Sequence, residues 1–118
     1  MKRRASVAQR KYSDCKSVDE MREKLSSEGF SIFSWQDSPG AYYSPHSHPH
    51  DEYIVVHSGE IVFLIDNEEF VVTAGDALDL PAGTVHAAEN RAGKPVGYMI
   101  CTRILVYLWI LLGVSSTF

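Results

Sequence analysis

The pattern of hydrophobic and polar positions changes near residue 30. Before it, Val18, Met21 and Leu25 recur at spacings of three and four, which is typical of one face of an amphipathic helix. From Phe30 onward the period falls to about two, the alternation of a half-buried strand. The pattern therefore predicts one short helix followed by an all-β body.

The ends of the helix have their own signals. Ser17-Val18-Asp19-Glu20 is a capping box, in which the Ser17 hydroxyl and the Glu20 carboxylate each accept a hydrogen bond from the other's backbone N–H. Gly29 suits the left-handed residue that ends a helix. We expect a helix over about 18–28 whose apolar stripe covers part of the β body.

Short β-rich runs alternate with turn signals such as Ser58-Gly59 and Ala74-Gly75 after residue 30. Short strands at this spacing, joined by hairpins, predict a small jelly-roll barrel of two sheets. The expected strands are Phe30–Trp35, Tyr42–Ser47, Tyr53–His57, Ile61–Asp66, Glu69–Thr73, Ala77–Leu80, Val85–Glu89 and Val96–Thr102.

Length and composition narrow the class of protein. The 118 residues make one domain, and 45% hydrophobic with 22% charged residues is an ordinary globular composition, which excludes disordered and collagen-like chains. The net charge of −4, from 11 basic and 15 acidic residues, provides no basic field for a phosphate backbone. We therefore expect no nucleic-acid partner.

The N-terminal residues 1–16 contain six of the eleven basic residues and few large apolar ones. We expect a flexible basic arm, with a tag for RNA or an anionic membrane as the alternative. No apolar segment follows the basic start, so it is not a signal peptide. Cys15 and Cys101 lie 86 residues apart and form neither a disulfide framework nor a zinc ribbon. These features favour a reducing cytoplasm.

Residues 104–118 form an apolar C-terminal segment beyond the expected domain at 17–103. Ile104 to Val114 is eleven apolar residues, whereas a bilayer crossing takes about 20. Extending the run back to Val96 places Arg103 near its middle, at a cost of roughly 2.5–3.5 kcal/mol. We expect an element buried in a homodimer interface; a tail anchor and a non-native end are the alternatives.

Histidines gather in one pentapeptide. His46, His48 and His50 are followed at once by Asp51 and Glu52. Residues two apart on an extended strand face the same side, so His46 and His48 form a chelating pair. Glu52, at the head of the next strand, can return to the same ion. A further ligand must come from a distant part of the chain, and His86 after the Pro81-Ala82-Gly83 turn is the candidate.

These residues belong to two spaced motifs. The first motif reads Gly40, five residues, His46-Ser47-His48, three residues, Glu52, six residues and Gly59. The second reads Gly75, five residues, Pro81-Ala82-Gly83, two residues, His86, three residues and Asn90. With these motifs the chain resembles a small single-domain cupin of the cupin type-2 conserved barrel family. The resemblance covers roughly residues 30–102 and implies a double-stranded β-helix, the jelly-roll barrel of that family.

The resemblance also implies that His46, His48, Glu52 and His86 bind one metal ion. Three neutral imidazoles and one carboxylate suit a divalent transition metal, either Fe, Mn, Ni, Cu or Zn, and leave two positions open on an octahedral ion. The alternative is a metal-free barrel whose inward histidines bond to each other and to water.

The alternation of strand faces also predicts which other side chains line the barrel. The predicted pocket is mostly apolar, and it has no interior Arg that could bind a phosphate or a dicarboxylate. His50 is either an exposed residue or a neighbour of the ligands that shuttles protons, and we expect His57 on the outer face, Asn90 in the scaffold and Cys101 in the core. Tyr42 or Tyr98 is a candidate for a hydroxyl near the open positions of the metal. The expected lining residues are Tyr42, Ser44, Ile54, Val56, Thr84 and Ala88.

Together these features predict a metal-binding cupin, a mononuclear-metal enzyme acting on a small organic substrate in the manner of a dioxygenase or an isomerase. The alternative is a non-catalytic cupin that binds or senses a small ligand and carries a structural metal. In either case we expect a cytoplasmic homodimer with a small-molecule ligand.

Overall fold

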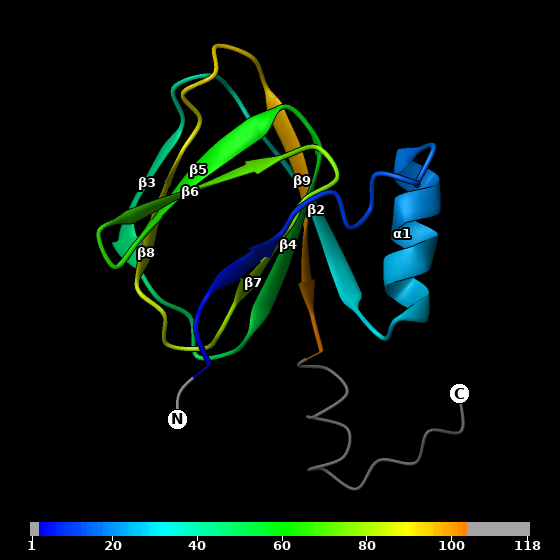
Figure 1. Cartoon of the computed structure of the whole chain (residues 1–118), viewed down its shortest axis with the longest axis horizontal. Coiled ribbons are helices and arrows are strands. Elements are labelled where there is room, and N and C mark those ends of the chain that lie inside the picture. The colour runs from blue at the N-terminus through cyan, green and yellow to red at the C-terminus, as the bar shows by residue number, and fades with distance from the viewer. Residues whose placement is uncertain (1–2, 104–118) are drawn as a thin grey trace, which may run out of the picture.

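The computed structural model describes residues 3–103, which form one helix and nine strands (Figure 1). All eight strands expected from the sequence are present, with ends shifted by two residues at most. The elements are β1 (Ser6–Ala8), α1 (Val18–Ser27), β2 (Ser31–Asp37), β3 (Tyr42–His46), β4 (Glu52–Ser58), β5 (Glu60–Ile65), β6 (Glu68–Thr73), β7 (Ala77–Leu80), β8 (His86–Glu89) and β9 (Val96–Thr102).

The strands form two antiparallel sheets. The five-stranded sheet has the order β1-β7-β4-β9-β2, and the four-stranded sheet has the order β3-β8-β5-β6. From β2 to β5 and again from β6 to β9, consecutive strands alternate between the sheets, as in a jelly roll, while β5 and β6 form a hairpin within one sheet. One hydrophobic core combines Ile54 and Leu78 from the first sheet with Ile61 and Phe63 from the second, so the sheets pack face to face. The predicted all-β double-stranded β-helix is confirmed.

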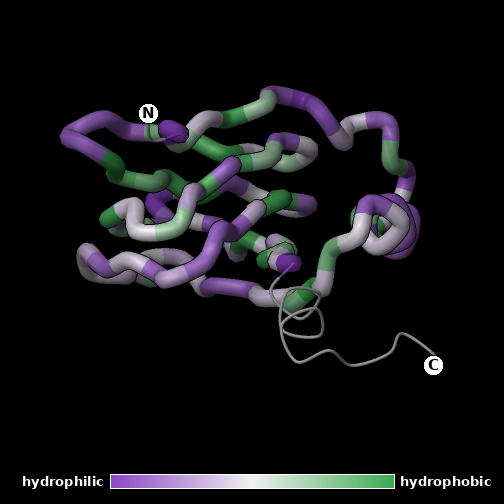
Figure 2. The backbone as a smooth tube through the Cα atoms, turned by 90° about the horizontal axis from the view of Figure 1, so that it is seen from below, coloured by the Kyte–Doolittle hydropathy of each residue, from purple (hydrophilic) through white to green (hydrophobic). Residues whose placement is uncertain are grey.

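A second core covers the outer face of the five-stranded sheet. Strand β9 contributes to both cores, because Tyr98 faces the other sheet while Met99 and Cys101 face outward. Met21 and Leu25 of α1 pack on this outer face. Figure 2 shows the helix end-on beside the strands rather than between the sheets. The helix therefore leaves the space between the sheets to strand side chains.

The caps of α1 agree with the sequence in most respects. The Ser17 hydroxyl accepts a hydrogen bond from the Glu20 backbone N–H at 3.0 Å, and Gly29 has a positive φ of 94°. The Glu20 carboxylate accepts from the backbone N–H of Lys16 at 3.0 Å and not from that of Ser17. Val18 is exposed, so the buried stripe of the helix is Met21 and Leu25.

The N-terminal residues differ from the expected flexible arm. Residues 6–8 form β1, which pairs with the outer edge of β7, and the Tyr12 side chain is buried in the second core. The Tyr12 hydroxyl donates to Glu28 Oε1 at 2.8 Å. A count of charges does not reveal these contacts, because the open edge of β7 pairs with backbone groups and a single aromatic ring packs in the second core.

The apolar segment 104–118 lies outside the described residues, so the dimer element, the tail anchor and the non-native end stay predictions. In the part of the chain that the structure describes, no helix has the length and apolarity needed to cross a bilayer.

Candidate metal centre

A bulge in β3 sets the direction of its side chains. In the pairing of β3 with β8, Tyr43 lies opposite Ala88 and His46 lies opposite His86, with a shift of register between the two pairs. Tyr43 and His46 both line the interior pocket although they are three residues apart. One extra residue on a strand has this effect, because it reverses the alternation of faces.

Two connections bring His48 toward His86. The backbone N–H of Gly83 donates to the carbonyl oxygen of His48 at 2.8 Å. The backbone N–H of Ala82 donates to Asp51 Oδ1 at 2.7 Å. These bonds join the segment after β3 to the turn before β8. They therefore fix the position of His48 relative to His86.

Three of the four predicted ligands come together in space. The side-chain donor atoms of His46, His48 and His86 all lie within 4.8 Å of one another, and this is the one such group found in residues 3–103. The ring centroid of His46 lies 4.3 Å from that of His86, and the centroid of His48 lies 5.3 Å from it. One ion placed between the three rings can contact them all.

Backbone carbonyl oxygens determine which ring nitrogen of His46 and of His86 is available to a metal ion. His46 Nδ1 lies 2.7 Å from the carbonyl oxygen of Ser44, and His86 Nδ1 lies 2.9 Å from that of Thr84. A carbonyl oxygen only accepts hydrogen bonds, so Nδ1 is the donor in each pair, and in the neutral form of each ring the lone pair is on Nε2. Burial lowers the pKa of His86, which is 3% exposed, and the neighbouring His46 and His48 act in the same direction. A neutral imidazole with a free Nε2 is the form that binds metals.

Glu52, the fourth predicted ligand, lies beside this group rather than within it. Its Oε1 is 3.7 Å from His48 Nε2, and its Oε2 is 3.4 Å from His50 Nε2. The Glu52 side chain is largely buried and lines the same pocket as the three histidines. The donor set of three imidazoles with an adjacent carboxylate fits a divalent transition metal. Whether Glu52 ligates that metal stays a prediction.

The three histidines line one side of a pocket of about 270 Å³ between the sheets. Of the lining predicted from the sequence, Ile54 and Ala88 are present, whereas Tyr42, Ser44, Val56 and Thr84 are not. Tyr42 is 56% exposed because the bulge puts Tyr43 inward in its place, and Val56 lies in the core. The pocket is lined by Phe33, Trp35, Tyr43, His46, His48, Glu52, Ile54, Phe63, His86, Ala88, Tyr98 and Ile100.

One buried carboxylate, which was not among the residues predicted from the sequence, accepts hydrogen bonds from the aromatic side of this pocket. Asp37 Oδ1 accepts from Trp35 Nε1 at 2.9 Å and from the Tyr43 hydroxyl at 2.5 Å, and Oδ2 accepts from the Tyr98 hydroxyl at 2.5 Å. Burial and the carboxylate raise the pKa of both tyrosines, so their hydroxyls stay protonated and donate. Phe33, Trp35 and Asp37 alternate along β2, and that spacing was the signal available in the sequence.

The remaining sequence predictions concern residues around the centre. Asn90 is scaffold, because its side-chain amide donates to the carbonyl oxygens of Lys94 at 2.7 Å and Ser38 at 3.3 Å. His57 faces the outer side of its sheet, against Gly97. Burial raises the pKa of the Cys101 thiol to about 12, as expected of a core residue. His50 is partly exposed beside Glu52, which leaves both of its predicted roles open.

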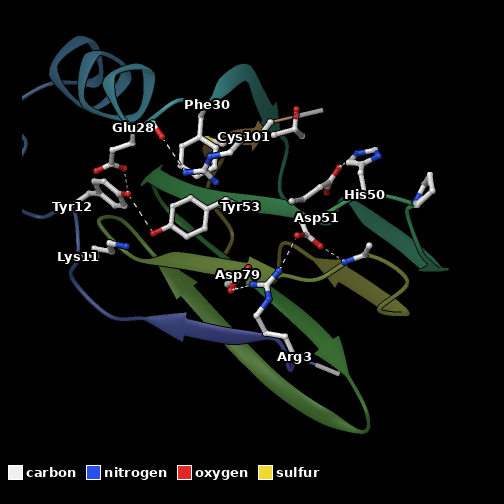
Figure 3. Close-up of a pocket in the computed structure, with 15 residues that line it drawn as sticks. Arg3, Lys11, Tyr12, Glu28, Phe30, His50, Asp51, Tyr53, Asp79 and Cys101 are labelled. Atoms are coloured by element: carbon white, nitrogen blue, oxygen red, sulfur yellow. Dashed lines mark hydrogen bonds and ion pairs between the residues drawn. The ribbon is translucent and has the colours of Figure 1, made fainter. Parts of the chain in front are cut away.

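A larger cleft of about 930 Å³ opens on the outer face of the five-stranded sheet (Figure 3). Its cations are engaged: Arg3 forms ion pairs with Asp79 and with Asp51, and Arg103 lies 3.8 Å over the ring of Phe30. Lys11 lies 5.3 Å over the ring of Tyr53. These charges and rings satisfy one another, so the smaller inner pocket, which contains the three histidines, is the candidate metal centre.

Comparisons with known proteins agree with this geometry. The sequence model of the family described as "Cupin domain" matches residues 33–103. No curated protein matches the sequence.

Among solved structures, a conserved protein of unknown function from Streptococcus pyogenes is similar, with 26% identity and a TM-score of 0.54 over 63% of each chain. A cupin superfamily protein from Desulfitobacterium hafniense has 20% identity and a TM-score of 0.56, over 64% of this chain and 67% of its own. A sugar phosphate isomerase of the cupin superfamily from Silicibacter pomeroyi has 29% identity and a TM-score of 0.55, over 64% of this chain and 51% of its own. The chain thus spans less than two thirds of the first and third of these proteins.

Proposed function

Because the chain belongs to the cupin domain family, we propose that it binds one divalent transition metal through His46, His48, Glu52 and His86 and acts as an enzyme on a small organic substrate. The observation that carries the proposal is the set of three imidazoles whose donor atoms lie within 4.8 Å at the side of an apolar pocket. If these imidazoles served only for packing, the Nε2 atoms of His46 and His86 would be expected to have hydrogen-bond partners in the protein.

The residues around the centre have separable tasks in this proposal. The carbonyl oxygens of Ser44 and Thr84 orient two of the imidazoles, and the pocket opposite them holds the substrate. Glu52 lowers the net charge of a bound divalent ion by one. When bound by these four residues, a metal would supply either redox chemistry toward dioxygen, as in a dioxygenase, or polarisation of a carbonyl group, as in an isomerase.

A second candidate is a non-catalytic cupin that binds or senses a small ligand and carries a structural metal. It is favoured by the hydrogen bonds of the pocket. The polar groups of Trp35, Tyr43 and Tyr98 are all directed to Asp37, so in the described residues the pocket offers no further free acid or base beside the histidines and Glu52. A reaction would then depend on the metal alone.

The relatives suggest substrates that the pocket does not favour. The Silicibacter pomeroyi protein is named a sugar phosphate isomerase. Among the described residues that line the pocket here there is no Lys or Arg to bind a phosphate. We therefore place a phosphosugar low among candidate substrates. A cytoplasmic homodimer is part of the proposal, and two unpaired cysteines are in keeping with a reducing compartment.

Metal content tests the proposal directly. The full chain, purified without air and without a histidine tag, is expected to contain close to one equivalent of Fe, Mn, Ni, Cu or Zn by elemental mass spectrometry. The double variant His46→Ala, His86→Ala is expected to contain less than a tenth of that amount. The control is His57→Gln, which removes a histidine from the outer face of β4 and should leave the metal content unchanged.

The identity of the metal and a turnover assay then separate the two candidates. Oxygen uptake or isomerisation that requires the metal, and that is lost in the double variant, supports the enzyme. Ligand binding without turnover in the metal-loaded protein supports the sensor. A folded wild type without metal, even after incubation with Fe(II), Mn(II) and Zn(II), would reject both.

A further inference from the structure

Two aromatic rings of the metal pocket are exposed to solvent. Phe33 is 58% exposed and Trp35 is 45% exposed, although both line the pocket that contains the histidines. Their ring centroids lie 5.7 Å apart at an interplanar angle of 22°, so they form a stacked pair. Apolar rings left open inside a pocket are surfaces that a ligand can cover.

The position of these rings follows from the pairing of β2 with β9. Phe33 lies opposite Ile100 and Trp35 lies opposite Tyr98, and all four side chains line the pocket. β2 is the last strand of its sheet in the described chain, so the rings lie at an open edge of that sheet. The exposed pair is therefore one wall of the pocket and not an isolated patch on the outer surface.

Asp37 holds this wall in place. It accepts hydrogen bonds from Trp35 Nε1 and from the hydroxyls of Tyr43 and Tyr98, which fixes the indole against two neighbouring rings before any ligand arrives. A fixed flat surface loses little conformational entropy when it binds. A second flat ring is the shape that such a surface accommodates best.

The charges of the pocket limit the ligand further. In the described residues that line it, the ionisable groups besides the two tyrosine hydroxyls are the three histidines and Glu52, and no Lys or Arg faces the aromatic wall. The pocket volume of about 270 Å³ lies just below the range of typical ligand pockets, which is roughly 300 to 1,000 Å³. The wall thus favours a small ring without charged substituents near it.

We propose that Phe33 and Trp35 form an aromatic subsite and that the ligand of the metal pocket is a small planar aromatic compound whose ring stacks on this wall while an oxygen substituent points to the histidines. This inference deepens the proposed function, because it names the substrate class of the same site. Covering of the two rings by a second copy of the chain is the competing occupant.

Isothermal titration calorimetry with two probes of equal skeleton tests the subsite. The probes are 2-naphthol, which is planar, and trans-2-decalol, its saturated and non-planar counterpart. The metal-loaded protein and the metal-free protein are both titrated. We expect 2-naphthol to bind about tenfold more tightly than trans-2-decalol in both forms.

Matched variants locate the effect. Phe33→Leu replaces the ring with another apolar side chain and removes no hydrogen bond. We expect this variant to weaken 2-naphthol binding about tenfold and to leave trans-2-decalol binding unchanged. Tyr42→Leu is the control, because Tyr42 is as exposed as Phe33 but lies outside the pocket. It should change neither affinity.

Several results would overturn the aromatic subsite. These are equal affinities for the two probes, an equal loss in Tyr42→Leu and Phe33→Leu, or no binding of 2-naphthol. A fall of the light-scattering mass from dimer to monomer in Phe33→Leu would show that the rings belong to an interface between copies. If metal binds stoichiometrically but 2-naphthol does not, the inference alone fails. If 2-naphthol binds with the expected ring selectivity to a protein that takes up no metal, the proposed function alone fails.

Discussion

The inner pocket and the outer cleft lie on opposite faces of the five-stranded sheet, and they differ in whether their polar groups have partners within the protein. The outer cleft is larger, yet its cations are matched by carboxylates and aromatic rings, as in the pairs of Arg3 with Asp51 and Asp79. In the inner pocket, Asp37 satisfies the aromatic donors, while His46 and His86 keep an unengaged Nε2. Free donor atoms, rather than volume, therefore mark the candidate site.

The largest expected effect comes from removing the carboxylate that organises the inner pocket. Asp37→Ala leaves three donors without their common acceptor, two of them buried or half-buried, and should lower the free energy of unfolding by about 3–5 kcal/mol. Asp37→Asn keeps an acceptor and should cost less. Urea unfolding followed by circular dichroism measures both. Equal and small losses of unfolding free energy in the two variants would show that the aromatic side chains keep their positions without Asp37.

Removing the metal should have the next largest effect. A ligand present at a hundred times its dissociation constant stabilises the folded state by about 2.7 kcal/mol. Treatment with 1,10-phenanthroline should therefore lower the Tm of the wild type by roughly 10 °C, and it should leave the Tm of His86→Ala unchanged. Calorimetry provides the measurement. Arg3→Gln, in the outer cleft, should show the full wild-type shift.

A pH dependence is expected on the outer side of the sheet. Burial opposes ionisation of Asp76, but hydrogen bonds from the backbone N–H groups of Thr73 and Arg10 and from the Thr73 hydroxyl outweigh it and lower the pKa of Asp76. The stabilisation is present above the unfolded pKa of about 3.9 and is lost as the pH falls through the lower folded value. The free energy of unfolding should decline more steeply below about pH 4 in the wild type than in Asp76→Asn. Parallel curves would contradict this.

The smallest effect is expected for the ion pairs of the outer cleft. The Arg3 side chain is about half exposed, so solvent screens its attraction to Asp51 and Asp79. Arg3→Gln should change the free energy of unfolding by no more than about 1 kcal/mol in urea titrations, and less at high salt. A loss as large as that of Asp37→Ala would remove the contrast between the two regions.

The sequence by itself determined the helix, the eight strands from residue 30 to residue 102 and the three histidines that meet. These features are local or periodic: a capping serine, turns at glycines and the alternation of strand faces all act within a few residues. The ligand spacing of His46 and His48 is likewise a property of one extended segment.

Only the tertiary structure decided which side chains surround the histidines. The bulge between Tyr43 and His46 depends on the pairing of β3 with β8, and it exchanged Tyr42 for Tyr43 in the pocket. The position of residues 6–8 depends on an open strand edge about 70 residues away in the chain. Asp37 became the common acceptor of three aromatic side chains because β2, β3 and β9 converge around it. The alternation along β2 indicates that Phe33, Trp35 and Asp37 share a face, but the partners of such long-range contacts leave no trace in the sequence, since local preferences do not specify them.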